Sequence, residues 1–330
     1  MPKSSNQKLK IWYLFKILNE KTDEHHPISM SEIISELEKY GINAERKSIY
    51  NDIELLINAG VDIISEKRDR FVYYIGDRDF QLAELKLLID FVQSSKFITA
   101  KKTGELIKKI EGLTSKNYAH ELHSQVYIND RVKTSNEKIY YNINYLYTAI
   151  NSGVRITFRY YKYNVLNNSK YKNNGNLYQV SPYGLVYSDD NYYLLAHYPK
   201  YEGITHFRVD KMTDITISSE KSIEIEKIAG KNFNFAEYVK KMFNMFRGET
   251  NTVTLNCKEE ILNVVIDKFG ENVFLRKGDN DRFFVTVKAD ISPAFFGWIF
   301  MLGETIEIVS PTDVRCSYNE HLRNIIKLYE

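Results

Sequence analysis

The residues best suited to binding chemistry lie between Ser181 and Met212, in a stretch rich in tyrosine. Two apolar runs flank the polar Ser188-Asp189-Asp190-Asn191, which predicts a β-hairpin, and the run Thr205–Val209 predicts a third strand. Because side chains alternate along a strand, several polar and aromatic ones are expected on faces outside the core. These are Tyr183, Tyr193, His197 and Arg208. Aromatic rings beside a guanidinium suit a planar, anionic ligand.

The residues alone leave a second interpretation of this stretch open. Arg208 could pair with Asp210 or Asp214, and the tyrosines could fill one face of the sheet. A lone histidine on a strand, such as His197, is commonly structural.

A second set of candidates begins the helix predicted for residues 44–56, which Asn43 would cap. Arg46 and Lys47 can neutralise phosphates, and the polar side chains after them can hydrogen-bond base edges. Those side chains are Ser48, Tyr50 and Asn51. The side chains expected on the buried face are Ile49, Ile53, Leu56 and Ile57.

The elements around this helix have the order of a DNA-binding motif. Helices are predicted over 7–18 and from Ser29 to Leu37, and two strands, 61–65 and 71–75, follow the third helix. The predicted ribbon has a basic tip with Lys67, Arg68 and Arg70. This is the order of a winged helix-turn-helix, in which the recognition helix meets base edges and the wing touches backbone. Residues 1–76 carry 11 Lys and Arg against 12 Asp and Glu, so a merely solvated helix face stays open.

Composition predicts a soluble protein with two or three domains. The chain has 330 residues, 43% hydrophobic and 27% charged, and its net charge of +2 does not by itself indicate nucleic acid. No apolar run approaches the roughly eighteen residues of a membrane span, and no signal-peptide core begins the chain. Cys257 and Cys316 are expected as buried, reduced thiols of a cytoplasmic protein.

The sequence has none of the common catalytic motifs. Paired carboxylates, HExxH, a Walker sequence and a nucleophile beside a base do not stand out. His120 and His123 lie three apart without neighbouring metal ligands, which favours surface histidines. We therefore predict no catalytic residue, no metal and no cofactor.

The remaining segments complete an α+β, multidomain chain. The four predicted domains are residues 1–76, a helical connector with dimer contacts at 77–135, a sensing domain at 136–228 and a C-terminal domain at 229–330. In the last domain the expected strands are 252–257, 283–288 and 305–309, and the expected helices are 261–269, 293–301 and 319–328.

Three motifs resemble those of the WYL-domain family of bacterial transcriptional regulators. They are Pro182-Tyr183-Gly184-Leu185, Tyr192-Tyr193-Leu194 and Phe207-Arg208-Val209-Asp210-Lys211-Met212. Tyr192 replaces the usual Trp, and Lys211 stands where Arg is more usual. Residues 46–53 resemble the recognition helix of DeoR-like regulators.

The resemblance implies a winged helix-turn-helix, a helical connector, a small Sm- or SH3-like β-barrel and a ferredoxin-like C-terminal extension. It also implies an effector pocket made by Ser181, Tyr183, His197 and Arg208, with Tyr193 nearby.

Together these features predict an effector-responsive, DNA-binding repressor. Its expected partners are double-stranded operator DNA, a nucleic-acid or nucleotide-like effector and a second copy of the chain, with no membrane. The alternative is a non-catalytic accessory or interaction module of a nucleic-acid-processing or defence system.

Overall fold

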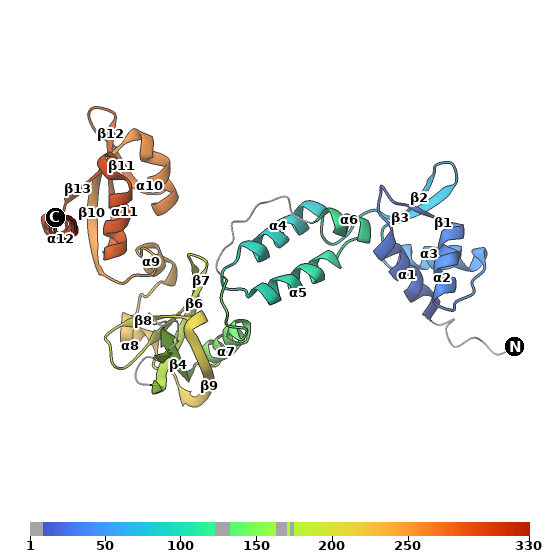
Figure 1. Cartoon of the computed structure of the whole chain (residues 1–330), viewed down its shortest axis with the longest axis horizontal. Coiled ribbons are helices and arrows are strands. Elements are labelled where there is room, and N and C mark those ends of the chain that lie inside the picture. Colours follow the sequence, from blue (N-terminus) through green and yellow to red (C-terminus); the bar gives the residue numbers. More distant parts are fainter. Residues whose placement is uncertain (1–8, 123–132, 163–169, 172–174) are drawn as a thin grey trace. The chain divides into compact units, whose positions relative to one another are not determined.

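The computed structural model describes residues 9–122, 133–162, 170–171 and 175–330. They belong to two compact units, residues 1–139 and 140–330. Helices and small antiparallel sheets follow one another along the chain (Figure 1), as expected of a mixed α and β protein.

The N-terminal unit begins with three helices and a small sheet. Its elements are α1 (Lys10–Lys21), β1 (Ile28–Ser29), α2 (Met30–Lys39), α3 (Arg46–Asn58), β2 (Ile63–Lys67) and β3 (Phe71–Ile75). β3 lies between β1 and β2 and is antiparallel to both. Ser29 caps α2 in a capping box with Glu32, as the sequence predicts for this N-cap. The helices pack on a core that includes Leu14, Ile17, Leu18, Ile33, Leu37 and Ile49.

Helix α3 differs from the prediction at both ends. Glu45 rather than Asn43 is its N-cap residue, and Ile57 is 47% exposed instead of buried. Each step of four residues turns about 40° around a helix, so Ile57 has rotated away from the stripe begun by Ile49 and Ile53. The helix predicted over 7–18 begins at Lys10 and continues to Lys21, and residues 7 and 8 lie outside the described residues.

The connector consists of α4 (Leu82–Ser94), α5 (Ala100–Glu111) and α6 (Lys116–Glu121), and α4 and α5 lie side by side in Figure 1. Leu85 and Ile89 of α4 are buried with Leu122. Leu87 and Phe91 of α4 are exposed, so its apolar side chains do not all face the same core. His120 lies in α6, whereas His123 lies outside the described residues.

Buried polar contacts join α6 to the loop after α1. The Asp23 carboxylate accepts hydrogen bonds from Ser115 Oγ at 2.5 Å and from the His26 amide at 2.9 Å. Arg78 donates to the Asn19 and Thr22 carbonyl oxygens, each at 2.8 Å. Burial would raise the pKa of Asp23, but the hydrogen bonds from Ser115 and His26 prevail and hold it below its ordinary value.

The C-terminal unit opens with a helix and a curled antiparallel sheet. The elements are α7 (Ile139–Ser152), β4 (Val154–Lys162), β5 (Lys170–Tyr171), β6 (Tyr178–Ser188), β7 (Asn191–His197), β8 (Ile204–Arg208) and β9 (Met212–Lys221). β4 pairs with β5, β6 and β9, and β6, β7 and β8 follow as a meander. Among the described strands β8 and β9 share no ladder, so the sheet curls without closing. Phe158 and Phe207 meet edge to face inside it, with ring centroids 5.1 Å apart.

The predicted hairpin of this sheet is present, with its turn at Asp189 and Asp190. Their φ angles of 49° and 61° suit the tight two-residue turn that matches the twist of paired strands. The residues on either side of β5, 163–169 and 172–174, lie outside the described residues.

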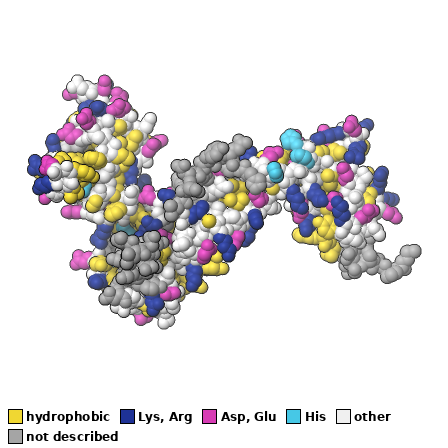
Figure 2. All heavy atoms as spheres, in the orientation of Figure 1, with side chains coloured by type: hydrophobic (Ala, Val, Ile, Leu, Met, Phe, Trp, Pro, Cys, Tyr) yellow, Lys and Arg dark blue, Asp and Glu magenta, His cyan; other side chains and the backbone are white. Residues whose placement is uncertain are grey.

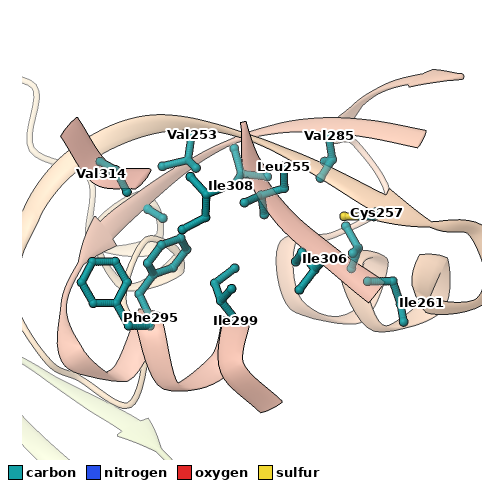
Figure 3. Packing of buried hydrophobic residues seen from close by; sticks show 14 of the residues in the cluster. Val253, Leu255, Cys257, Ile261, Val285, Phe295, Ile299, Ile306, Ile308 and Val314 are labelled. Carbon is teal, nitrogen blue, oxygen red and sulfur yellow. The ribbon is translucent and has the colours of Figure 1, made fainter. Parts of the chain in front are cut away.

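A second sheet and its helices form the rest of this unit. The elements are α8 (Ile225–Ala229), α9 (Phe235–Lys240), β10 (Glu249–Lys258), α10 (Leu262–Phe269), β11 (Phe274–Lys277), β12 (Arg282–Ile291), α11 (Pro293–Met301), β13 (Ile306–Ser310) and α12 (Thr312–Ile326). The strand order is β11-β12-β10-β13. In Figure 3, Leu255 and Ile308 of this sheet face Phe295 and Ile299 of α11. β11, an exposed edge strand, was not among the predicted strands.

The two cysteines are free, but only one is buried. Burial raises the pKa of the Cys257 thiol to about 12. The expectation of a buried thiol is wrong for Cys316, because α12 buries only Val314 fully and turns Cys316 to solvent.

No helix in the described ranges is long and apolar enough to cross a membrane. Within the same ranges no group of three or more His, Cys, Asp or Glu side chains could hold a metal ion.

We predict that Asp23→Asn lowers the free energy of unfolding of the N-terminal unit by about 1–3 kcal/mol at neutral pH, because buried hydrogen bonds to a charge are lost. The folded-state pKa of Asp23 lies below its ordinary value of 3.8, so this stabilisation is present above about pH 4 and is lost as pH falls through the folded-state pKa. Urea unfolding followed by Trp12 fluorescence, in a Trp298→Phe background, measures this free energy of unfolding.

The difference in free energy of unfolding between Asp23→Asn and its parent should shrink at acidic pH. The control Glu24→Gln, at an exposed neighbour, should leave the free energy of unfolding nearly unchanged. A difference that does not depend on pH would contradict the assignment.

Candidate functional site

The first turns of α3 present a polar surface. Arg46, Lys47, Tyr50 and Asn51 are exposed, as the sequence predicts. Ser48 is different, because its hydroxyl accepts a hydrogen bond from the ammonium group of Lys10 on α1.

The buried Lys10 also forms an ion pair of 2.7 Å with Asp52. The half-buried Ser48 therefore helps to fix α3 against α1.

Tyr50 connects α3 to the sheet as well as facing solvent. Its side chain is 47% exposed, yet its hydroxyl forms a hydrogen bond with the hydroxyl of Tyr73 on β3. Burial, together with this hydrogen bond, raises the pKa of Tyr73 to about 12. The helix start and the β2–β3 hairpin are thus held together.

The predicted basic tip lies at the turn between β2 and β3, where Lys67, Arg68 and Arg70 are exposed. Arg68 pairs with Glu66 at 3.1 Å, and Arg70 lies 3.5 Å from Glu32. Exposed ion pairs of this kind are weak, so these cations can exchange partners. Figure 2 shows cationic and acidic side chains mixed on the visible face of the N-terminal unit, in keeping with its balanced charge.

In the curled sheet, four of the five predicted effector residues share one face. Ser181 pairs with His197 across β6 and β7, and Tyr193 pairs with Arg208 across β7 and β8. His197 and Tyr193 lie four residues apart on β7, so both pairs point to the same side. Tyr183 lies at an irregularity in the pairing of β6 with β7.

This face is more enclosed than the sequence suggests. Leu195 and Ile204 on it are buried in a cluster with Met242 and Met245, which follow α9. His206, also on this face, lies 3.0 Å from the Met245 carbonyl oxygen through Nδ1 and 3.0 Å from the Tyr238 hydroxyl through Nε2. The expected non-core face is therefore partly a second core, because the segment after β9 folds back over it.

Arg208 is held by a neighbouring carboxylate. Its guanidinium donates to both oxygens of Asp210, at 3.0 and 2.9 Å, and to Asn191 Oδ1 at 2.7 Å. The hydrogen bond with Asp210 raises the pKa of Arg208. The structure thus has the Asp210 pairing that the sequence left open, and the role of Arg208 in binding an effector stays a prediction.

A pocket of about 400 Å³ opens beside the strand β6. The pocket lies between β4, the start of β6 and the segments that follow β7 and β9. Its lining residues are Arg155, Leu177, Gln179, Val180, Ser181, Tyr198, Pro199, Lys200 and Ile223. Pockets for small molecules are commonly about 300–1,000 Å³. Of the predicted effector residues only Ser181 lines this pocket, and its hydroxyl accepts a hydrogen bond from the Ile223 amide at 3.0 Å.

Arg155 is a cation at this pocket that the sequence candidates did not include. Its guanidinium donates to Glu220 Oε2 at 2.9 Å, while its Nε is buried without a hydrogen-bond partner in the described part of the chain. The Tyr183 hydroxyl is also buried without a hydrogen-bond partner among the described residues. Burial raises the pKa of Tyr183 to about 12, against the opposing effect of the nearby Arg155. Arg155 directly precedes Ile156, which pairs with Val180, so the pairing of β4 with β6 places Arg155 beside Ser181 at the pocket. The sequence does not reveal this pairing.

Comparison with known protein families identifies one domain in this chain. Residues 142–217 match the sequence profile of the WYL domain. The comparison with curated proteins gives no match.

Among solved structures, the proteasome accessory factor PafBC of Arthrobacter aurescens is similar over 100% of this chain and 51% of its own, with 14% identity and a TM-score of 0.29. A CRISPR Cas-related protein is similar over 75% of this chain and 70% of its own, with 13% identity and a TM-score of 0.38. This chain therefore spans about half the length of PafBC. The WYL part of the resemblance is confirmed: the chain contains a WYL domain, which covers the curled sheet from α7 into β9.

Proposed function

We propose that the chain is an effector-responsive transcriptional regulator that binds operator DNA. One observation carries the proposal: a single chain joins an exposed, cationic helix start to a WYL domain with a cation-lined pocket. Three helices followed by the β2–β3 hairpin have the order of a winged helix-turn-helix. In this proposal α3 is the recognition helix, the hairpin is the wing, and the regulator is a repressor.

In this proposal the cationic side chains of the N-terminal unit contact the DNA phosphates. Arg46 and Lys47 neutralise phosphates at the start of α3, while Tyr50 and Asn51 reach base edges. Lys67, Arg68 and Arg70 would contact the backbone from the wing. Since residues 1–76 carry as much acid as base, binding relies on this local surface and weakens steeply with salt.

The WYL domain would report the effector, a nucleic-acid or nucleotide-like anion. Ser181 lines the pocket, Tyr183 and His197 lie beside it, and Tyr193 and Arg208 lie farther along the same face. A ligand here can change operator binding only if it binds one arrangement of the chain better than another. In this proposal the curled sheet is a small Sm- or SH3-like barrel, and the β-α-β-β-α-β order of β10 to β13 is ferredoxin-like.

A second copy would complete the DNA-reading unit. Leu87 and Phe91 on α4 are 58% and 69% exposed, while the opposite side of the helix packs against α5. Two copies joined through this face would present two recognition helices to an inverted repeat.

We predict that Arg46→Ala and Lys47→Ala each weaken operator binding and lower the slope of log affinity against log salt by about one, because each removes one phosphate contact. Fluorescence anisotropy of a labelled operator, identified first by genome-wide binding-site mapping, measures both quantities. Arg315→Ala, an exposed cation of the other unit, is the control and should change neither. Wild-type affinity and slope in both α3 variants would reject α3 as the recognition helix.

We predict that Phe91→Glu converts the dimer into a monomer and weakens operator binding at least tenfold, because a charge is placed on an apolar contact. Sedimentation velocity measures the mass, and Lys86→Gln, which changes the net charge by the same amount at an exposed position of α4, is the control. A dimer in the Phe91→Glu variant would place the interface elsewhere.

We predict opposite effects of Tyr183→Phe on stability and on response. The lost hydroxyl is buried and has no partner among the described residues, so its removal should leave the free energy of unfolding unchanged or raise it by up to about 1 kcal/mol. The change of operator affinity on adding single-stranded oligonucleotides or nucleotides should shrink. Trp298 fluorescence in urea and anisotropy measure the two effects. A stable variant with a full response would remove Tyr183 from the effector site.

A further inference from the structure

We propose that Arg155 and Lys200 form a phosphate-binding subsite in the WYL pocket, and that Glu220 occupies Arg155 until a ligand displaces it. This rests on the proposed effector role of the WYL domain, and it names the chemical group that the domain recognises. Arg155 and Lys200 both line the pocket of about 400 Å³, together with Gln179 and Ser181.

The contacts of Glu220 mark where an anion binds. Arg155 Nη1 at 2.9 Å and Gln179 Nε2 at 3.0 Å donate to the same carboxylate oxygen, Oε2. A guanidinium and a carboxamide that converge on one anionic oxygen would hold a phosphate oxygen equally well. The carboxylate is thus an internal substitute for the ligand.

The pairing of β4 with β9 is irregular at this point. Val154 pairs with Lys221 and Ile156 with Ile217, so Ser218, Ser219 and Glu220 stand opposite Arg155 alone. Extra residues in one strand redirect side chains, and such bulges are frequent beside functional sites. Here the bulge brings Glu220 to Arg155.

Three buried polar atoms in this part of the domain have no hydrogen-bond partner among the described residues. Arg155 Nε, the Tyr183 hydroxyl and the Ser222 hydroxyl are all buried without a hydrogen bond in the described part of the chain. Ser222 directly precedes Ile223, which lines the pocket. Tyr183 is close enough to Arg155 for the positive charge to lower the pKa of its hydroxyl, against the larger effect of burial. Buried polar groups are rarely left unsatisfied, so a group of them beside a pocket points to a ligand that supplies acceptors.

The exposure of the paired carboxylates, Asp210 and Glu220, indicates which of Arg208 and Arg155 binds the anion. The Asp210 side chain that holds Arg208 is only 15% exposed, so a ligand that displaced it would leave that carboxylate poorly solvated. The Glu220 side chain is 56% exposed and regains water when it leaves Arg155. Displacement is therefore far less costly at Arg155.

The pocket's size and lining suit the phosphate of a nucleotide. Tyr198 lines the pocket and offers an aromatic surface to a base, and its ring packs against Tyr178 with centroids 5.1 Å apart. Lys200 is exposed and adds a second positive charge beside Arg155. A terminal phosphate of a mononucleotide and the internal phosphates of a single strand share this chemistry.

The test is isothermal titration of the full chain with three probes: adenosine 5′-monophosphate, adenosine, and a tetradeoxynucleotide that has no terminal phosphate. We expect a phosphate-bearing probe to bind and adenosine to bind at least tenfold more weakly. Glu220→Gln should tighten binding roughly two- to fivefold, because it removes the competing charge. Arg155→Gln should weaken binding at least about tenfold. Arg159→Gln, on the same strand and paired with Asp214, is the matched control and should stay within about twofold.

The two sources of phosphate give different patterns. Preference for the mononucleotide assigns the subsite to a terminal phosphate, and preference for the tetranucleotide assigns it to internal phosphates; either supports the proposal. Because Glu220→Gln predicts a gain, a misfolded variant cannot imitate the expected result.

Several results would overturn the assignment. These are unchanged or weaker binding in Glu220→Gln, wild-type binding in Arg155→Gln, equal binding of adenosine, and no binding of any probe at millimolar concentration. Loss of binding in Arg208→Gln with full binding in Arg155→Gln would move the cation to Arg208 and leave the regulator proposal intact. Operator affinity, measured separately, tests that proposal independently.

Discussion

The pairing of β4 with three other strands is the constraint on which the WYL domain depends. Ile156, Phe158 and Tyr160 are buried on one face of this strand, where Phe158 packs against Phe207. Because side chains alternate, Arg155 must lie on the other face, beside Ser181 and the pocket. A slip of one residue would place the aromatic residues in solvent and Arg155 in the core, so packing fixes the cation's position.

Two arginines of this domain have different surroundings for a physical reason. Arg208 is neutralised by Asp210, two residues along the chain and mostly shielded from water. Arg155 is neutralised by Glu220, which comes from another strand and remains largely exposed. The first pair is costly to open and therefore stabilises the local turn. The second exchanges readily, which makes it suitable for binding.

In the N-terminal unit a buried ion pair decides which side of α3 is available. Lys10 contacts both Ser48 and Asp52, so it ties α1 to α3 at a position close to the helix start. Buried pairs of this kind contribute little net stability, but a lost partner is costly, so they hold one orientation. Four of the five polar side chains predicted for DNA contact on α3 remain exposed, and Ser48 becomes part of the scaffold.

The sequence by itself determined the local features. The hairpin turn at Asp189 and Asp190, the Ser29 cap and the helix Pro293–Met301 follow from neighbouring residues, and the motifs around Tyr183 and Arg208 identified the WYL domain. Tertiary structure alone decided that Arg155 meets Glu220, that Ser48 contacts α1, and that Met242 and Met245 cover the face of Tyr193. Those outcomes depend on strand register and on contacts between distant segments. Alternation along one strand gives two faces without saying which neighbour covers each, and only the packing of the whole unit supplies that answer.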